Sequence, residues 1–228
     1  MKTYFAIQQA ERKADIYIFG DIVPFEWFPG DVSAYGLQQQ IEQLDVDEIA
    51  VHIDSYGGAV SEGWAIYNTL RKHPAKIVTY GDGFVASAAL YPFMAGDERI
   101  ASNLSAYYLH EVVTGAYGYA KDLRAAANEA ELFTEIGTKA FTERTAMTEE
   151  EIRELMAEET WLTPEEALEK GIATSIVSDE LPKYAQAAKR DFMQRMMQKK
   201  SAEPVPENPK KPTEKENMMQ ALRGLANA

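Results

Sequence analysis

Two residues of this sequence have types and positions that suit nucleophilic catalysis, Ser87 and His110. The stretch "TYGDGFVASAALYPFMAG" (79–96) predicts a strand, a glycine-bearing turn and a helix of small and apolar residues, with Ser87 near the first turn of that helix. A hydroxyl there lies close to unpaired backbone N–H groups and the positive end of the helix dipole, which suits a nucleophile whose product is an oxyanion. Most serines in such positions simply cap their helix, and Ser87 taken alone favours that interpretation.

A nucleophilic serine needs a base, and His110 is the best placed of the three histidines. It closes the strand-like "SAYYLH" (105–110), from which a side chain could reach across a sheet edge. A histidine at a strand end is more often a hydrogen-bonded surface residue. His52 alternates within a strand and His73 ends a helix, so neither is better placed. The acidic composition offers too many carboxylates to select the one that would orient an imidazole.

A pair of glycines marks a second strand-to-helix junction. In "VHIDSYGGAVSEGWAIYNTL" (51–70), Gly57 and Gly58 follow an apolar run and precede a helical pattern. Glycine serves where φ must be positive or where another group approaches the backbone closely. The pattern therefore indicates either a loop that a ligand approaches or a loop whose geometry alone requires glycine.

Composition excludes several classes of protein and site. The 228 residues include no Cys, which rules out a disulfide framework, a thiolate metal site and a Cys nucleophile, and three scattered His favour no metal centre. A net charge of −13 argues against a general nucleic-acid binder. The chain shows neither a secretory-signal pattern at its N-terminus nor an apolar run long enough to span a bilayer, so we expect a cytoplasmic protein with no membrane partner.

Strand-like runs alternate with helical patterns along most of the chain. The expected strands are 14–22, 47–54, 75–82 and one or two within 99–113, and the expected helices are 33–44, 61–72 and a long one over 120–147. Such alternation implies parallel pairing in a layered α/β domain. Capping boxes at Thr148 to Glu151 and Thr163 to Glu166 predict two further helices, the second with Pro164 at its first position and Gly171 after its last turn.

The last part of the chain differs in composition from the rest. We expect one folded domain over 1–182, followed by a basic amphipathic helix (183–200), a linker (201–216) too rich in Pro and charge to bury a core, and a short C-terminal helix (217–228). Residues 189–228 hold nine basic and five acidic side chains, which leaves a charge of −17 on the residues before them.

Four blocks of the sequence resemble, in order and spacing, the ClpP-type serine peptidases. The blocks are "IDSYGGAVSEGWAIYNTL", "GFVASAALYPFMAG", "YYLHEVVTG" and "ETWLTPEEALEKGIATSI". The resemblance covers about residues 14–180 and is closer to the phage relatives of that family, the head maturation (prohead) proteases. It implies a ClpP/crotonase-like α/β fold of repeated β-β-α units with a long projecting helix, and a Ser-His-Asp triad.

By position in the resemblance, Ser87 is the nucleophile and His110 the general base. The acidic residue of the family stands just before an aromatic-Leu-Thr/Ser block, and here Glu159 of "EETWLT" holds that place. The housekeeping members have Asp there, so the carboxylate of this chain is one methylene longer. Glu158 remains the alternative.

The resemblance also gives the paired glycines a role. It implies that the N–H of Gly58 and that of Ala88, the residue after the nucleophile, form an oxyanion hole. Gly57 and Ala59 then belong to the substrate-binding loop, and a side chain at Gly58 is expected to stand where the substrate carbonyl must lie. Tyr56 stands where the housekeeping members usually have Pro.

The function implied is that of a serine endopeptidase without a cofactor. We expect a homo-oligomeric ring with the 120–147 helix at a subunit interface, processing phage capsid, scaffold or portal proteins in the host cytoplasm or the assembling prohead. Little sequence precedes "ADIYIFG" to form loops that engage an ATP-driven unfoldase, which favours this role over an ATP-dependent Clp-type degradative peptidase subunit. A crotonase-like acyl-CoA enzyme, which would leave Ser87 and His110 without a purpose, and a catalytically inactive assembly scaffold are the remaining alternatives.

Overall fold

The computed structural model describes residues 7–10, 12–24 and 32–177, with the side chains of 7–10 left out. The chain divides into two units, 1–180 and 181–228, and every described residue belongs to the first. The helix expected over 183–200, the linker over 201–216 and the helix over 217–228 lie outside the described residues.

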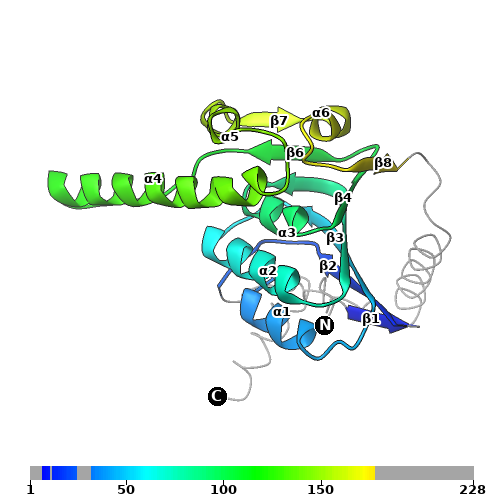
Figure 1. The fold of residues 1–228 in the computed structure, drawn as a ribbon. Coiled ribbons are helices and arrows are strands. Elements are labelled where there is room, and N and C mark those ends of the chain that lie inside the picture. Colours follow the sequence, from blue (N-terminus) through cyan, green and yellow to red (C-terminus); the bar gives the residue numbers. More distant parts are fainter. Residues whose placement is uncertain (1–6, 11, 25–31, 178–228) are drawn as a thin grey trace, which may run out of the picture. The chain divides into compact units, whose positions relative to one another are not determined.

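A mixed eight-stranded sheet is the framework of the described unit (Figure 1). Its strands are β1 (Ile7–Ala10), β2 (Lys13–Ile18), β3 (Glu48–Ser55), β4 (Lys76–Ala86), β5 (Glu98–Ser102), β6 (Ala106–Leu109), β7 (Thr160–Leu162) and β8 (Ser175–Val177). The strand order is β1-β2-β3-β4-β5-β8, and β6 pairs with β4 and β7. Only the β1–β2 and β6–β7 pairs are antiparallel. Parallel neighbours need crossover connections, which the helices supply.

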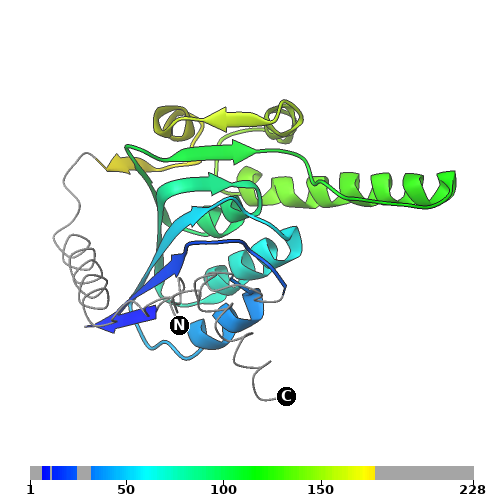
Figure 2. The same cartoon turned by 180° about the vertical axis from the view of Figure 1, so that it is seen from behind.

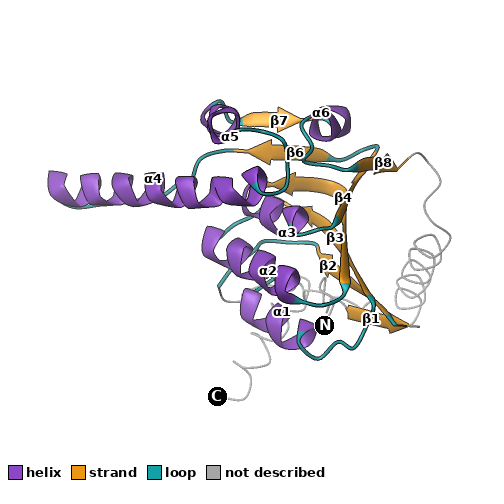
Figure 3. Ribbon diagram, in the orientation of Figure 1, coloured by secondary structure: helices purple, strands orange, loops and turns teal. Residues whose placement is uncertain are grey.

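Helices lie on one side of the central strands (Figure 3). They are α1 (Ala34–Ile41), α2 (Val60–Lys72), the 3₁₀ helix η1 (Ser87–Ala89), α3 (Leu90–Met94), α4 (Ala120–Thr142), α5 (Glu149–Ala157) and α6 (Pro164–Glu169). Their apolar faces bury Leu37, Ile66 and Leu70 against sheet residues such as Ile49 and Val51. A smaller cluster on the opposite face of the sheet comes from alternate positions of the same strands. The sheet expected from the sequence is therefore confirmed, as is its layer of helices.

Helix α4 projects well beyond the other elements (Figure 2). It ends at Thr142, five residues before the expected end at 147. The hydroxyl of Thr145 donates to the carbonyl of Phe141 and accepts from the N–H of Met147, which turns the chain. Thr148 then caps α5, and both predicted capping boxes are present.

Strand β4 continues through the stretch where the sequence predicted a glycine-bearing turn, so that prediction is wrong. A Cβ on Gly81 would meet the Tyr107 hydroxyl, and a Cβ on Gly83 would meet the Asp54 carboxylate. The two glycines thus leave room for the side chains of Tyr107 and Asp54, and the strand continues through both glycines. The first half of β4 pairs with β5 and the second half with β6. The strand therefore extends to Ala86, the residue directly before Ser87.

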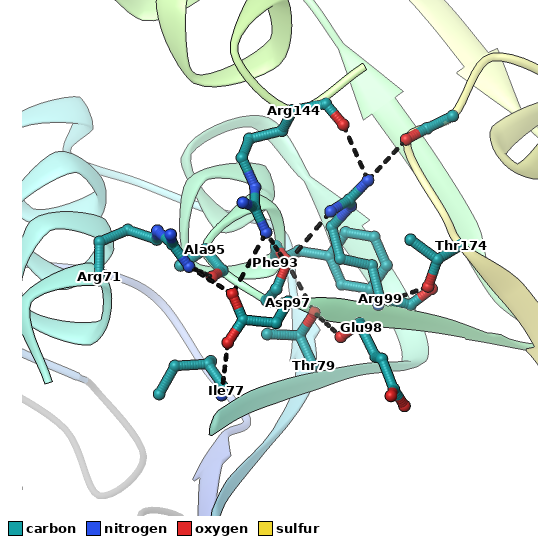
Figure 4. A network of polar contacts seen from close by, with 12 residues as sticks. Arg71, Ile77, Thr79, Phe93, Ala95, Asp97, Glu98, Arg99, Arg144 and Thr174 are labelled. Carbon is teal, nitrogen blue, oxygen red and sulfur yellow. Dashed lines mark hydrogen bonds and ion pairs between the residues drawn. The ribbon is translucent and has the colours of Figure 1, made fainter. Parts of the chain in front are cut away.

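A buried guanidinium fastens the C-terminal elements to β5 (Figure 4). Arg99 is only 5% exposed and donates to the carbonyls of Gly96, Arg144, Gly171 and Ile172. Burial, and then the nearby Arg144 charge, lower the pKa of Arg99 to about 10. These bonds connect the α6–β8 segment and the α4–α5 turn to β5.

No helix in the described ranges is both long enough and apolar enough to cross a membrane.

Candidate active site

Ser87 stands at the sharp junction between β4 and η1. Its φ of 55° is in the left-handed region, which is uncommon for a residue with a side chain. Ala86 occupies the N-cap position of η1 and no side chain caps that helix. The Ser87 hydroxyl therefore does not cap the helix, which was the alternative that the sequence left open.

The Ser87 hydroxyl is paired with His110, which directly follows β6. Ser87 Oγ lies 2.7 Å from His110 Nε2, and His110 Nδ1 lies 2.5 Å from the carbonyl oxygen of Glu111. A carbonyl can only accept, so Nδ1 must carry the imidazole proton. The Nε2 lone pair then faces the serine O–H, as a general base requires.

The other two histidines are engaged elsewhere. His52 Nδ1 lies 2.7 Å from Asp82, and the His52 ring is stacked between those of Tyr17 and Tyr80. His73 bonds the backbone of residues 44 and 75. Neither contacts Ser87, which agrees with the choice of His110 from the sequence.

The glycine loop packs directly against the serine turn. Gly57 has a φ of 93°, and a Cβ there would lie 2.6 Å from the Ala86 carbonyl oxygen and 2.8 Å from Ser87 Cβ. Gly58 has a φ of 141°, and its Cβ would lie 2.1 Å from the carbonyl oxygen of Ile22. A side chain at Gly58 would therefore strike the Ile22 backbone, a clash that the sequence did not predict, and its effect on the substrate carbonyl stays a prediction.

Two backbone N–H groups are available beside the serine. The bridge between Ile22 and the loop uses the Gly57 carbonyl and the Ala59 N–H, so the N–H of Gly58 takes no part in it. The N–H of Ala88 lies in the first turn of η1, where helix donors have no partner within the helix.

These groups line one cavity of about 180 Å³. Its lining includes Ser87, His110, Gly58 and Ala88. The apolar part of the lining includes Val60, Leu90, Tyr91, Val112, Phe141 and Met156. The cavity thus combines a paired serine and histidine with an apolar recess.

Glu159 does not contact the imidazole in this structure. Its Oε2 lies 3.5 Å from the hydroxyl of Tyr108, and the Nδ1 atom that a triad carboxylate would bind is bonded to the Glu111 carbonyl. Glu159 follows the C-cap residue of α5, Glu158, and has a φ of 51°. No contact of the Glu158 side chain with His110 is present among the described residues.

A family model described as Clp protease matches residues 34–180, well over half of the chain. The chain belongs to the Clp protease family. Members of this family are serine peptidases, so the expected enzyme class, a serine-type hydrolase of peptide bonds, is confirmed.

Curated members of the Clp protease family resemble the chain over most of their length. The ATP-dependent Clp protease proteolytic subunit 1 of Prochlorococcus marinus is 31% identical over 177 residues, which cover 74% of this chain and 90% of that protein. The proteolytic subunit 2 of Treponema pallidum is 29% identical over 165 residues, with 68% and 83% covered. Both are bacterial proteolytic subunits, so the comparisons favour the Clp-type alternative over the expected phage branch, which they do not support.

The fold of the Clp protease family is also found by structural comparison. A ClpP1 mutant from Listeria monocytogenes superimposes with a TM-score of 0.63 at 23% identity, covering 73% of this chain and 92% of that one. This likeness confirms the ClpP/crotonase-like fold.

Sequence reasoning missed a row of aromatic side chains beside the site. The rings of Tyr56 and Phe84 are stacked 4.7 Å apart, those of Phe84 and Trp161 meet edge to face, and those of Trp161 and Tyr108 are stacked 4.5 Å apart. The Tyr108 ring lies 5.2 Å from that of His110. The i, i+2 spacing of Tyr108 and His110 in a strand was the available signal, because such residues share a face.

Proposed function

We propose that this chain is a Clp-type proteolytic subunit in which Ser87 is the nucleophile and His110 the general base. The 2.7 Å contact between Ser87 Oγ and His110 Nε2, in the tautomer set by the Glu111 carbonyl, carries the proposal. In the proposed reaction His110 takes the serine proton while Oγ attacks the peptide carbonyl, and then gives that proton to the leaving amine. Water hydrolyses the acyl-enzyme by the same route.

The N–H groups of Gly58 and Ala88 are proposed as the oxyanion hole. Neither N–H donates a backbone hydrogen bond to another described residue, and both residues line the same cavity as Ser87, which supports this role. Two such donors stabilise the negative oxygen of the tetrahedral intermediate, and one donor typically contributes about 3–4 kcal/mol. Gly57 and Ala59 position this loop, and the proposed reaction needs no cofactor.

Assembly into a homo-oligomeric ring is part of the proposal. The relatives are named as subunits, and α4 projects from the unit with Leu132 and Ile136, which lie one turn apart on the same face of the helix, both exposed. An apolar face on a projecting helix favours a subunit interface. Cleavage of phage capsid, scaffold or portal proteins rests on the motif resemblance alone, and we propose the degradative role in its place.

A fluorophosphonate probe tests the chemistry. It should label the wild-type chain and a Ser175→Ala control, in which an exposed serine of β8 is removed, but not Ser87→Ala. Ser87→Ala and His110→Ala should each abolish nearly all peptide hydrolysis, and the double variant should be little worse, because the pair acts as a unit. Labelling of Ser87→Ala equal to wild type would exclude this nucleophile, and an unlabelled wild-type chain would favour the scaffold or acyl-CoA alternative.

A second assay separates the biological roles. A Clp-type subunit should degrade a folded protein to short peptides only when an ATP-driven unfoldase is added. Limited cleavage of a capsid or scaffold protein without ATP would instead support head maturation.

A further inference from the structure

The segment that leaves β6 is joined to the rest of the unit at one point. From Glu111 to Gly118 it forms no helix or strand, and it runs beside α4 toward the N-terminal end of that helix (Figure 2). Among the described residues, a single hydrogen bond joins this segment to a helix or strand. In it the Val112 N–H donates to Thr134 Oγ1 of α4 at 3.0 Å.

Thr134 belongs to the buried face of α4. The residue is 4% exposed, and its hydroxyl donates to the Ala130 carbonyl at 2.9 Å, which leaves an oxygen lone pair for the Val112 N–H. Phe141 follows seven positions later, so it lies on the same face of the helix, two turns away. Phe141 lines the cavity that contains Ser87. One helix therefore carries part of the cavity lining and also the anchor of the segment after His110.

The anchored segment supplies another part of the same lining. Val112 and Val113 both line the cavity, as Phe141 does. Because α4 is a rigid element, the Thr134 bond fixes the separation between these two parts of the lining. We propose that Thr134 is a positioning residue that sets the width of the apolar recess, and hence the size of the substrate side chain that the recess accepts. This proposal rests on the function proposed above for Ser87 and His110.

The physical basis is the partner that the Val112 N–H requires. The recess shares its cavity with Ser87, so the side chain that enters it belongs to the residue whose carbonyl carbon Ser87 attacks. One methylene group in a closely fitting apolar pocket changes kcat/KM by roughly tenfold or more. Without the Thr134 hydroxyl, the partly buried N–H lacks a partner, and the segment shifts outward to reach water. The recess then widens and discriminates less between large and small side chains.

Thr134→Val in the full-length protein tests the proposal, because it replaces the hydroxyl with a methyl group of similar size. The measured quantity is the ratio of kcat/KM for two fluorogenic peptides that have either leucine or alanine directly before the cleaved bond. We expect the preference for leucine to fall by about fivefold or more, mainly through a higher KM for the leucine peptide. Thr134→Ser keeps the hydroxyl and should retain the wild-type preference.

Thr138→Val is the matched control. Thr138 is also buried on α4, one turn after Thr134, but its hydroxyl donates to the Glu135 carbonyl within the helix. The same loss of a hydroxyl should therefore leave the preference unchanged. If urea unfolding shows that Thr134→Val does not fold, Thr134→Ala provides the same test, because it also removes the hydroxyl and should lower the preference to the same extent.

An unchanged preference in Thr134→Val would overturn the proposal. An equal fall in Thr134→Ser would also overturn it, because the hydroxyl would then not be the determinant. The same holds for an equal fall in Thr138→Val, which would assign the effect to any buried hydroxyl of α4. Failure of the proposed function is a different outcome in the same assay, because Ser87→Ala would then retain hydrolysis of both peptides.

Discussion

A Cβ atom on Gly57 would lie 2.8 Å from the Cβ atom of Ser87. The glycine loop and the nucleophile turn therefore pack backbone against backbone, and the space between them admits no methyl group. Because neither segment can shift without moving Ser87, the geometry of the site depends on Gly57, a residue without a reactive side chain.

Gly57→Ala should lower both stability and peptide hydrolysis. The new methyl group strikes the backbone of residues 86 and 88, and the φ of 93° is unfavourable for alanine. We therefore expect the free energy of unfolding to fall by about 1–3 kcal/mol. Urea unfolding and peptidase assays measure the two effects. Gly115→Ala is the control, since a Cβ on Gly115 meets nothing within 4 Å. Equal unfolding midpoints for the two variants would contradict the packing argument.

Ser87→Gly should be more stable than Ser87→Ala, although both should be inactive. The φ of 55° is strained for alanine and free for glycine, and we expect a difference of about 1 kcal/mol in the free energy of unfolding. Thermal unfolding of the two variants measures it. A more stable Ser87→Ala variant would mean that the turn relaxes when the hydroxyl is removed.

Arg99→Met should destabilise the fold strongly. It removes a donor from four buried or partly buried carbonyls, of which that of Gly96 keeps a second donor in Arg144, at a cost of about 3 kcal/mol or more. Arg99→Lys should recover only part of the loss, because an ammonium group cannot reproduce the planar fork of donors. The exposed Lys76, which pairs with Glu98, provides the control, and Lys76→Met should shift the urea midpoint little. If Arg99→Met shifted the urea midpoint as little as Lys76→Met, the role of Arg99 in connecting the C-terminal elements to β5 would be refuted.

Asp97→Asn should make the free energy of unfolding less dependent on pH in the acid range. Burial by itself raises the pKa of Asp97, but the hydrogen bond from the Ile77 N–H and the ion pair with Arg71 outweigh it and lower the pKa below its usual value. A carboxylate with a depressed pKa in the folded state contributes stability above its unfolded pKa, about 3.9, and this contribution is lost as the pH falls through the folded value.

Urea unfolding at pH 7 and pH 3 measures this contribution. The wild type should lose more stability than Asp97→Asn between the two pH values, by a modest amount because the side chain is 40% exposed. Asp45→Asn, at a side chain that is 93% exposed, is the control. Parallel pH profiles for wild type and Asp97→Asn would contradict the assignment.

The sequence by itself determined the parts of the molecule that depend on local pattern. The alternation of strands and helices, both capping boxes and the places of Ser87 and His110 at the ends of their elements follow from apolar periodicity and from residues such as Thr148 and Thr163. These signals are readable because a cap or a strand face involves residues at most a few positions apart.

Only the tertiary structure decided which groups meet across the sheet. The sequence placed a turn at Gly81 and Gly83, but Tyr107 and Asp54 lie in the space above those glycines and β6 pairs with the strand beyond them. Likewise, that Glu159 meets Tyr108 across 51 positions of the chain depends on how α5 and β7 dock against β6. No local pattern records such a contact, because its geometry is set by the packing of whole elements and not by the residues adjacent in the chain.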